Sequence, residues 1–448
     1  MKLLKLNLSG VRGIVGETLT PELIIDFSSA FGTMQPPGPI LVGRDPRKSG
    51  PMVQEAVISA LLSTGHEVIN LGICPTPVIQ FLVRHYRAAG AVSITAGHNP
   101  GEWNALTFIN SEGTWLNEFQ GSELLDIYHL GRFAHKKLKK SPPVMTELNP
   151  EEIYFSWLRR RIRTDEIGRA RFKVVVDPCN GAGALMVNKL CEALGCQLIA
   201  INNEPSGYFP HDPEPRPRNA GEVASLVRAT GADAGFLLNS DVSRVSLVTE
   251  TGETLSEEYT FPTVASYWLK QHRGPVVTNL STSRMIDGVA GKFNLPVIRT
   301  RVGQSAVIQT MLQEDAVLAG EGSGGLAARE FHPAFDGFVT IALVLEMMAV
   351  EQKKLSEIVR TLPRLHIVKD KILCPPHRLH TLVTETRKLY PMAPVNSLDG
   401  LLFDLKDVWV QVRASSTEPM IRIIAESPSE LRARVEVEKV VAFLNRLL

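Results

Sequence analysis

Residues 171–202 read RFKVVVDPCNGAGALMVNKLCEALGCQLIAIN, and this stretch decides the fold class. It consists of an apolar run, a turn rich in glycine and other small residues, an amphipathic helix, a glycine and a second apolar run. Short runs of Val, Ile and Leu between helices are typical of buried, mostly parallel strands. Parallel strands need a long crossover, which is usually a helix. The stretch therefore predicts a βαβ unit.

The same pattern recurs at residues 39–72 and 274–303. The three copies begin near Ile40, Val174 and Val276, and these starts are too far apart for a solenoid repeat. Spacing of this kind favours tandem α/β domains. The length of 448 residues agrees with several domains, because single hydrophobic cores stop growing beyond about 250–300 residues.

The last part of the chain has a different pattern. We expect two strands on either side of a turn near Lys406, a third strand at 420–427, and a long terminal helix that starts after Ser427 and Pro428. Strands followed by a helix favour a smaller α+β domain. The predicted domains are residues 1–145, 146–250, 251–362 and 363–448.

The composition is that of an ordinary globular protein, with 44% hydrophobic residues, 21% charged residues and a formal net charge of +1. The apolar content excludes a disordered chain, and the balanced charge argues against a nucleic-acid partner. The most apolar helical stretch, 340–350, contains Glu346 and is too short to cross a bilayer, so no membrane partner is expected. The five cysteines form no zinc-like cluster, and reduced thiols in a cytoplasmic protein are the expectation.

Five polar or glycine-rich loops are candidates for chemistry, because functional groups concentrate on loops held by a rigid scaffold. The first presents Arg12 between two glycines, and a guanidinium suits phosphate contacts. The second, residues 95–100, reads TAGHNP and offers His98 after a strand-like run. The third, residues 239–244, reads NSDVSR, and Asp241 is its only carboxylate.

The two remaining loops lie later in the chain. Residues 320–325 read GEGSGG, and Glu321 can accept hydrogen bonds from sugar hydroxyl groups. Residues 413–419 read RASSTEP, with Arg422 shortly after. Two guanidinium groups, three hydroxyl groups and a tight turn are typical of a phosphate-binding nest. Each loop taken alone is also compatible with a purely structural turn.

Taken in order, these loops resemble those of the α-D-phosphohexomutase superfamily, which includes phosphoglucomutases, phosphomannomutases and phosphoglucosamine mutases. The resemblance covers nearly the whole chain and extends to the segments VGRDPRKSG, NLGICPTPV, VVDPCNGAG and PSGYFPHDPEPRP. It implies a four-domain architecture around a central cleft, with three related α/β domains that contain mixed sheets and a smaller C-terminal α+β domain. It also implies a hexose phosphate as the ligand.

In that family, a phosphoserine in a TASHNP-like loop gives its phosphate to a hexose monophosphate, and the bisphosphate that forms returns its other phosphate. Mg²⁺ is held by the phosphoserine and by three aspartates of a DGDADR-like loop. Here Gly97 stands at the phosphoserine position, so this phosphoenzyme cannot form. Asn239 and Ser243 stand at two of the metal positions, and only Asp241 remains as a vestigial ligand.

Gly325 replaces the histidine of the sugar loop, Thr107 stands where the family has a lysine, and three customary glycines are replaced, at Ala105, Ser240 and Ser416. The remaining site positions keep the residues of the family. The resemblance assigns sugar binding to Glu321 and Ser323. It assigns phosphate binding to Arg413, Ser415, Ser416, Thr417 and Arg422, and the reacting region to Arg12, Gly97, His98 and Arg244.

Three functions follow from this pattern. The main hypothesis is a pseudo-mutase, a sensor or regulatory protein that binds a hexose phosphate without a cofactor and whose phosphoserine- and Mg²⁺-dependent activity is lost or strongly reduced. The first alternative is an active phosphohexomutase, an isomerase that uses His98 as phosphate acceptor or Asp241 with Mg²⁺. The second alternative is a structural or interaction protein. A homo-oligomer or a protein partner is compatible with all three.

Overall fold

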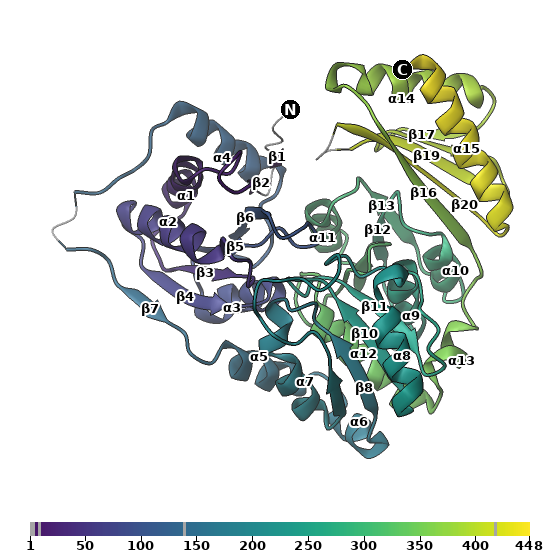
Figure 1. Cartoon of the computed structure of the whole chain (residues 1–448), viewed down its shortest axis with the longest axis horizontal. Coiled ribbons are helices and arrows are strands. Elements are labelled where there is room, and N and C mark those ends of the chain that lie inside the picture. The colour runs from purple at the N-terminus through teal and green to yellow at the C-terminus, as the bar shows by residue number, and fades with distance from the viewer. Residues whose placement is uncertain (1–4, 8–9, 138–139, 416–418) are drawn as a thin grey trace.

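The computed structural model describes residues 5–7, 10–137, 140–415 and 419–448. Its strands form four sheets that follow one another along the chain, and helices flank each sheet (Figure 1). The first sheet has seven strands, the second and third have four each, and the last has five. The first three sheets are mixed and the last is antiparallel, which confirms the predicted fold class.

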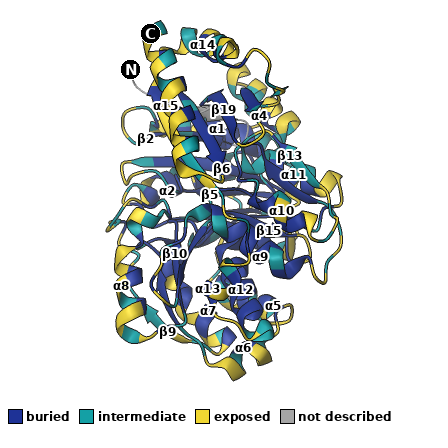
Figure 2. Cartoon of the chain, turned by 90° about the vertical axis from the view of Figure 1, so that its right-hand side faces the viewer, coloured by how far each residue is buried: buried dark blue, intermediate teal, exposed yellow. Residues whose placement is uncertain are grey.

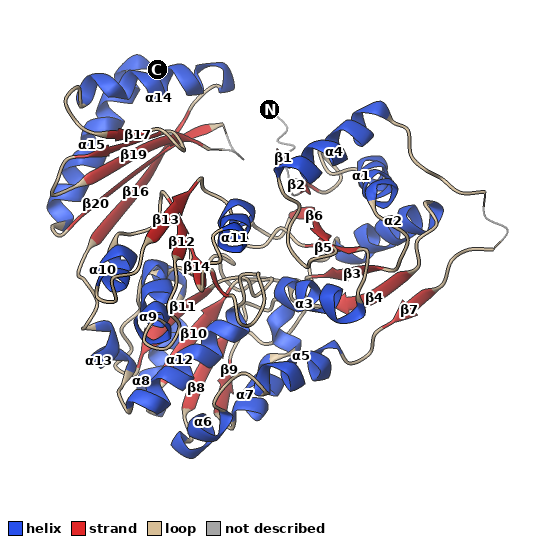
Figure 3. Ribbon diagram, turned by 180° about the vertical axis from the view of Figure 1, so that it is seen from behind, coloured by secondary structure: helices blue, strands red, loops and turns tan. Residues whose placement is uncertain are grey.

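The first sheet has the order β1-β2-β6-β5-β3-β4-β7. Helices α1 and α2 cover one face of this sheet and α3 covers the other (Figure 3). The elements are β1 (Lys5–Asn7), β2 (Gly10–Ile14), α1 (Pro21–Met34), β3 (Ile40–Arg44), α2 (Gly50–Ser63), β4 (Val68–Ile73), α3 (Thr76–Tyr86), β5 (Gly90–Ile94), β6 (Trp103–Asn110), α4 (Glu118–Leu130) and β7 (Val144–Thr146).

The second sheet has the order β11-β10-β8-β9. Its elements are α5 (Pro150–Arg159), α6 (Thr164–Ala170), β8 (Lys173–Asp177), η1 (Ala182–Leu185), α7 (Val187–Leu194), β9 (Gln197–Ala200), η2 (Pro217–Asn219), α8 (Gly221–Thr230), β10 (Ala234–Leu238) and β11 (Val245–Thr249).

The third sheet has the order β13-β12-β14-β15. Its elements are η3 (Glu257–Tyr259), α9 (Thr260–Trp268), β12 (Val276–Asn279), α10 (Met285–Gly291), β13 (Val297–Thr300), α11 (Gln304–Gln313), β14 (Leu318–Gly320), β15 (Leu326–Ala328), α12 (Gly337–Glu351) and α13 (Leu355–Val359).

The threefold pattern of the sequence appears as one repeated topology. In each of the three copies, the first strand pairs in parallel with the strand that follows its crossover helix: β3 with β4, β8 with β9, and β12 with β13. On its other side it pairs in parallel with a third strand, which an antiparallel fourth strand then extends. The three predicted βαβ units are therefore confirmed.

The fourth sheet has the order β16-β20-β19-β18-β17, and α14 and α15 pack against it. Its elements are β16 (His366–Leu373), η4 (Pro376–Arg378), α14 (Leu379–Glu385), η5 (Thr386–Leu389), β17 (Val395–Asn396), β18 (Leu401–Asp404), β19 (Trp409–Ala414), β20 (Met420–Ser427) and α15 (Glu430–Leu447). The helix starts two residues after the predicted Ser427-Pro428 start. Ser427 still pairs with His366 in the sheet, and Ser429 accepts a hydrogen bond from Arg432 N as the N-cap.

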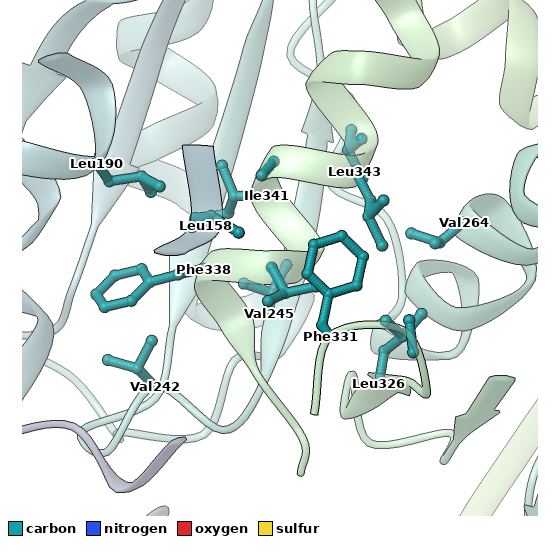
Figure 4. Packing of buried hydrophobic residues seen from close by; sticks show 14 of the residues in the cluster. Leu158, Leu190, Val242, Val245, Val264, Leu326, Phe331, Phe338, Ile341 and Leu343 are labelled. Atoms are coloured by element: carbon teal, nitrogen blue, oxygen red, sulfur yellow. The ribbon is translucent and has the colours of Figure 1, made fainter. Parts of the chain in front are cut away.

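The centre of the molecule is buried (Figure 2), and most of its buried side chains are hydrophobic. Helix α12 is buried from Gly337 to Met348, packs against α6 and α9, and contacts the aromatic rings of α5 through Phe338, so the second and third domains share one core (Figure 4). Asp336 accepts hydrogen bonds from the backbone N–H groups of Phe338 and Val339 as the N-cap of α12, and from Tyr154 Oη of α5. No helix in the described part of the chain has the length and apolarity that a membrane span requires.

Candidate functional site

The loop at residues 95–100 connects β5 and β6 and is held by a buried ion pair of Arg47 and Asp45. Arg47 Nη2 donates to Gly97 O at 2.9 Å and to Asn99 O at 2.7 Å, and Arg47 Nε is 2.9 Å from Asp45 Oδ2. Thr95 Oγ1 donates to the same Asp45 oxygen at 2.6 Å and accepts from Gly97 N at 2.9 Å. The loop is therefore set before any ligand arrives.

Gly97 has a φ of +56°, in the left-handed region that favours glycine. A Cβ atom built there would be 3.4 Å from Asp241 Oδ2, an ordinary van der Waals distance. The position predicted as the former phosphoserine thus faces the remaining carboxylate of the 239–244 loop, as the resemblance implies. Ser240 Oγ donates to Gly97 O at 2.7 Å and to Asp45 Oδ2 at 3.1 Å, which joins the two loops.

His98 lies among guanidinium groups from three domains. Burial lowers the pKa of His98 well below 6.5, and the charges of Arg244, Arg12, Arg422 and Arg216 lower it further. The imidazole is therefore neutral at pH 7. Arg12 Nη1 donates to the neighbouring Asn99 Oδ1 at 2.6 Å. Positive charge from distant parts of the sequence converges at one place, which suits a phosphate group.

The hydrogen bonds within the 239–244 loop do not fit a magnesium site. Asp241 Oδ1 accepts from Asn239 Nδ2 at 2.7 Å, from Ser243 Oγ at 2.7 Å and from Ser243 N at 3.1 Å. Asn239 cannot turn its amide oxygen toward an ion, because that oxygen already accepts from Arg244 N at 3.0 Å. The loop therefore surrounds one carboxylate with hydrogen-bond donors, whereas Mg²⁺ requires oxygen acceptors.

The rest of the described structure offers no cluster of metal ligands either. Within the described residues, no group of three or more His, Cys, Asp and Glu side chains is arranged to hold a metal ion. Asp241, Asn239 and Ser243 are nonetheless adjacent and buried. The structure thus brings the three predicted metal positions together, but as one carboxylate hydrogen bonded to two neutral side chains.

The loop at residues 320–325 connects β14 and β15. Glu321 Oε1 accepts from Gly303 N at 3.2 Å, and Glu321 Oε2 accepts from Ser323 Oγ at 3.3 Å. A Cβ atom at Gly325 would approach the ring of Phe335 to 2.4 Å. The aromatic ring occupies the space that a larger residue at this position would need.

Arg413 lies at the end of β19 opposite Arg422 of β20. It is 9% exposed, and its Nε has no hydrogen-bond partner. Among the described residues no carboxylate forms an ion pair with Arg413, although the negative charges of Asp399 and Glu321 favour its charged form. Burial and the neighbouring Arg422 lower the pKa of Arg413. Ser415 follows with its backbone N–H donating to Met420 O at 2.9 Å, and Ser416 and Thr417 lie outside the described residues.

Sequence reasoning missed three contributors. Arg47 and Asp45 belong to a quoted motif, but nothing local shows that they hold a loop 50 residues later. Arg216 lies in the segment PSGYFPHDPEPRP, and its Nε is 2.8 Å from Glu214 Oε2. That segment is rich in proline, which predicts a surface loop. Only the fold shows that the loop brings the charge of Arg216 near His98.

The chain matches the phosphoglucomutase/phosphomannomutase family in all of its parts: alpha/beta/alpha domain I at residues 4–134, domain II at 152–252, domain III at 256–365 and the C-terminal domain at 380–442. A phosphoglucomutase/phosphomannomutase of Thermococcus kodakarensis is 35% identical over 98% of both chains. A phosphoglucosamine/phosphogalactosamine mutase of Sulfurisphaera tokodaii is 32% identical over 94% of both.

The fold gives the same result. A phosphoglucomutase/phosphomannomutase family protein from Burkholderia thailandensis superposes with a TM-score of 0.85 at 24% identity, over 99% of this chain and 96% of that one. The match of all four domains, together with two relatives above 30% identity, shows that this chain belongs to the phosphoglucomutase/phosphomannomutase family.

Proposed function

We propose that this family member binds a hexose phosphate and does not carry out phosphoserine- and Mg²⁺-dependent transfer. The observation that carries the proposal is Arg413. A guanidinium that is nine-tenths buried without a carboxylate partner among the described residues is costly, unless an anion completes it. A ligand phosphate is the anion that the family membership suggests.

The other proposed contacts rest on the family resemblance. Arg413, Arg422 and Ser415, with Ser416 and Thr417 of the same loop, would hold one phosphate. Glu321 and Ser323 are hydrogen bonded to each other and would receive the sugar hydroxyl groups. Arg12, Arg244 and Arg216 surround His98 and would face the opposite end of the ligand.

The absence of standard transfer rests on two local features. Gly97 has no nucleophilic atom, and Asp241 Oδ1 is occupied by three hydrogen-bond donors, so the loop offers a divalent cation only the second oxygen of a single carboxylate. Phosphoryl transfer depends on cations positioned at the transferring group.

The test is calorimetric titration of the full chain with the 6-phosphates of glucose, mannose and glucosamine, with added Mg²⁺ and with EDTA. We expect saturable binding of at least one sugar phosphate with the same affinity in both conditions. A parallel assay primed with the hexose 1,6-bisphosphate should show no interconversion of 1- and 6-phosphates. Binding that requires Mg²⁺, or efficient interconversion, would contradict the proposal.

A second candidate is an active mutase with His98 as phosphate acceptor. The observation that favours it is the neutral imidazole beside four guanidinium groups, since a neutral histidine can act as a nucleophile. A ring nitrogen would take the phosphoryl group of a hexose bisphosphate while the released sugar oxygen takes a proton from water, and the reverse step would phosphorylate the other hydroxyl group. An acid-labile phosphohistidine that disappears in His98→Asn is the expected sign of this route.

A further inference from the structure

A cavity of about 190 Å³ lies between the first and third domains. Its walls are α3, the loop that joins β6 to α4, and α11. The residues that matter here are Gln80, Asn110, Trp115, Gln304, Gln309 and Leu312. None of the residues assigned to the candidate site lines this interdomain cavity.

The two sides of the interdomain cavity are joined. Ser305 Oγ of α11 donates to Leu116 O of the first domain at 2.9 Å. On the first-domain side, Asn110 Oδ1 accepts from the backbone N–H of Glu112 at 3.0 Å and from Thr114 Oγ1 at 3.1 Å. The cavity is thus built from ordered walls.

Three polar atoms of the walls are buried without a hydrogen-bond partner: Gln80 Oε1, Trp115 Nε1 and Gln304 Nε2. Gln80 is 1% exposed, and its Nε2 donates to Gly113 O at 3.0 Å, which fixes the amide and leaves Oε1 as the unpaired atom. Unsatisfied buried polar groups are rare in proteins because each is costly. Three of them around one cavity indicate that something else pairs with them.

The chemistry of the walls defines the class of occupant. One unpaired atom is an acceptor and two are donors, so the occupant must both donate and accept, as hydroxyl groups do. The described residues that line the cavity include no lysine, arginine or histidine, and their one charged side chain is the carboxylate of Glu112, which is exposed; this lining disfavours a phosphate or another anion. The two free donors disfavour a cation. The indole ring of Trp115 adds an apolar surface against which the C–H groups of a ring can pack.

We propose that the interdomain cavity binds a small neutral polyhydroxylated molecule of the size of a monosaccharide. A cavity of about 150 Å³ accommodates benzene, so the available volume admits a compact ring with its hydroxyl groups directed at the amide side chains. This site is separate from the hexose-phosphate site, and its ligand carries no phosphate.

The test is calorimetric titration of the full chain with unphosphorylated D-glucose, D-mannose and N-acetyl-D-glucosamine. Gln80→Leu removes the fixed acceptor, and Leu312→Phe fills the partly exposed edge of the cavity, where it leaves the core intact. Leu431→Phe is the matched control, because Leu431 is 71% exposed on α15. Thermal unfolding of each variant checks that the fold is kept.

We expect saturable binding of at least one of these sugars by the wild type and by Leu431→Phe, and at least tenfold weaker binding by both cavity variants. Equal affinity in the cavity variants would place the sugar elsewhere and overturn the proposal. No saturable binding of any of the three sugars by the wild type would show that the cavity holds only water. Arg413→Ala should leave this binding unchanged, so the outcome is independent of the proposed function.

Discussion

Replacement of Arg413 by alanine should weaken hexose-phosphate binding without lowering the stability of the protein. Arg413 is 9% exposed, and its one recorded hydrogen bond, from Nη1 to the adjacent Ala414 O, is long at 3.4 Å. Arg422 lies directly across the strand pair and repels it. In the free protein the side chain is therefore a buried charge with little compensation.

The expected magnitude follows from the type of contact. A hydrogen bond to a charged group contributes about 1.5–3 kcal/mol, and each 1.4 kcal/mol is about tenfold in Kd. Arg413→Ala should therefore raise the Kd for the bound sugar phosphate by about 10- to 150-fold. A structural arginine behaves differently, since removal of one partner of a buried ion pair costs about 3–5 kcal/mol of stability.

The assay is calorimetric titration with the tightest-binding sugar 6-phosphate, together with urea unfolding of the same samples. Arg434→Ala is the matched control, because Arg434 is exposed on α15 and pairs only with Glu430 at 2.7 Å within the described residues. Unchanged affinity in Arg413→Ala would refute the anion-binding argument. Unchanged affinity together with a loss of several kcal/mol in stability would show that Arg413 is structural.

Three further predictions concern the other loops. Gly97→Ser should not restore mutase activity in a bisphosphate-primed assay. It should lower the free energy of unfolding in urea by about 1–2 kcal/mol, because an L-residue at φ +56° is strained. Full mutase activity would show that the donors around Asp241 do not exclude Mg²⁺. Asp241→Ala should leave two buried donors, Ser243 Oγ and Ser243 N, unpaired at about 1–3 kcal/mol each, while Asn239 Nδ2 keeps its bond to Ser243 Oγ. Unchanged urea unfolding would contradict the hydrogen-bond cluster. The pKa of His98 is held well below 6.5, so folded His98 stays neutral while the unfolded chain takes up a proton below pH 6.5. Between about pH 7.5 and about pH 5.5 the wild type should therefore lose about 1 kcal/mol more stability than His98→Gln, and parallel profiles would disprove the shift.

The repeated βαβ units could be predicted because their signal is local. Runs such as Val174–Val176 are apolar at every position, as strands buried on both faces require, and each is followed by an amphipathic helix. The two strands on either side of the turn near Lys406 also follow from a local signal, and Lys406 has a φ of +73° at that turn. The domain boundaries at 145, 250 and 362 remain predictions.

The contacts that shape the site could not be predicted, because they join residues far apart in the sequence. Arg47 reads as a solvent-exposed arginine before a helix, yet it is fully buried by four carbonyl groups of the 97–103 region. The obstruction of Gly325 by Phe335 depends on how β15 and the following loop fold back. The convergence of Arg216 and Arg422 at His98 likewise depends on the arrangement of three domains.

The C-terminal domain has a hydrophobic core apart from the one that the first three domains share, and this arrangement predicts how the parts of the protein unfold. One continuous core runs from Phe81 of α3 through α12, whereas the C-terminal sheet has a core of its own with α14 and α15 and meets the third domain through a cluster of only four buried residues, Leu280, Leu402, Trp409 and Ile424. Heating should therefore produce two calorimetric transitions, one for the first 360 or so residues together and one for the remainder. Limited proteolysis in the segment between α13 and β16 should release a C-terminal fragment that keeps its antiparallel sheet, while no single one of the first three domains can be released intact.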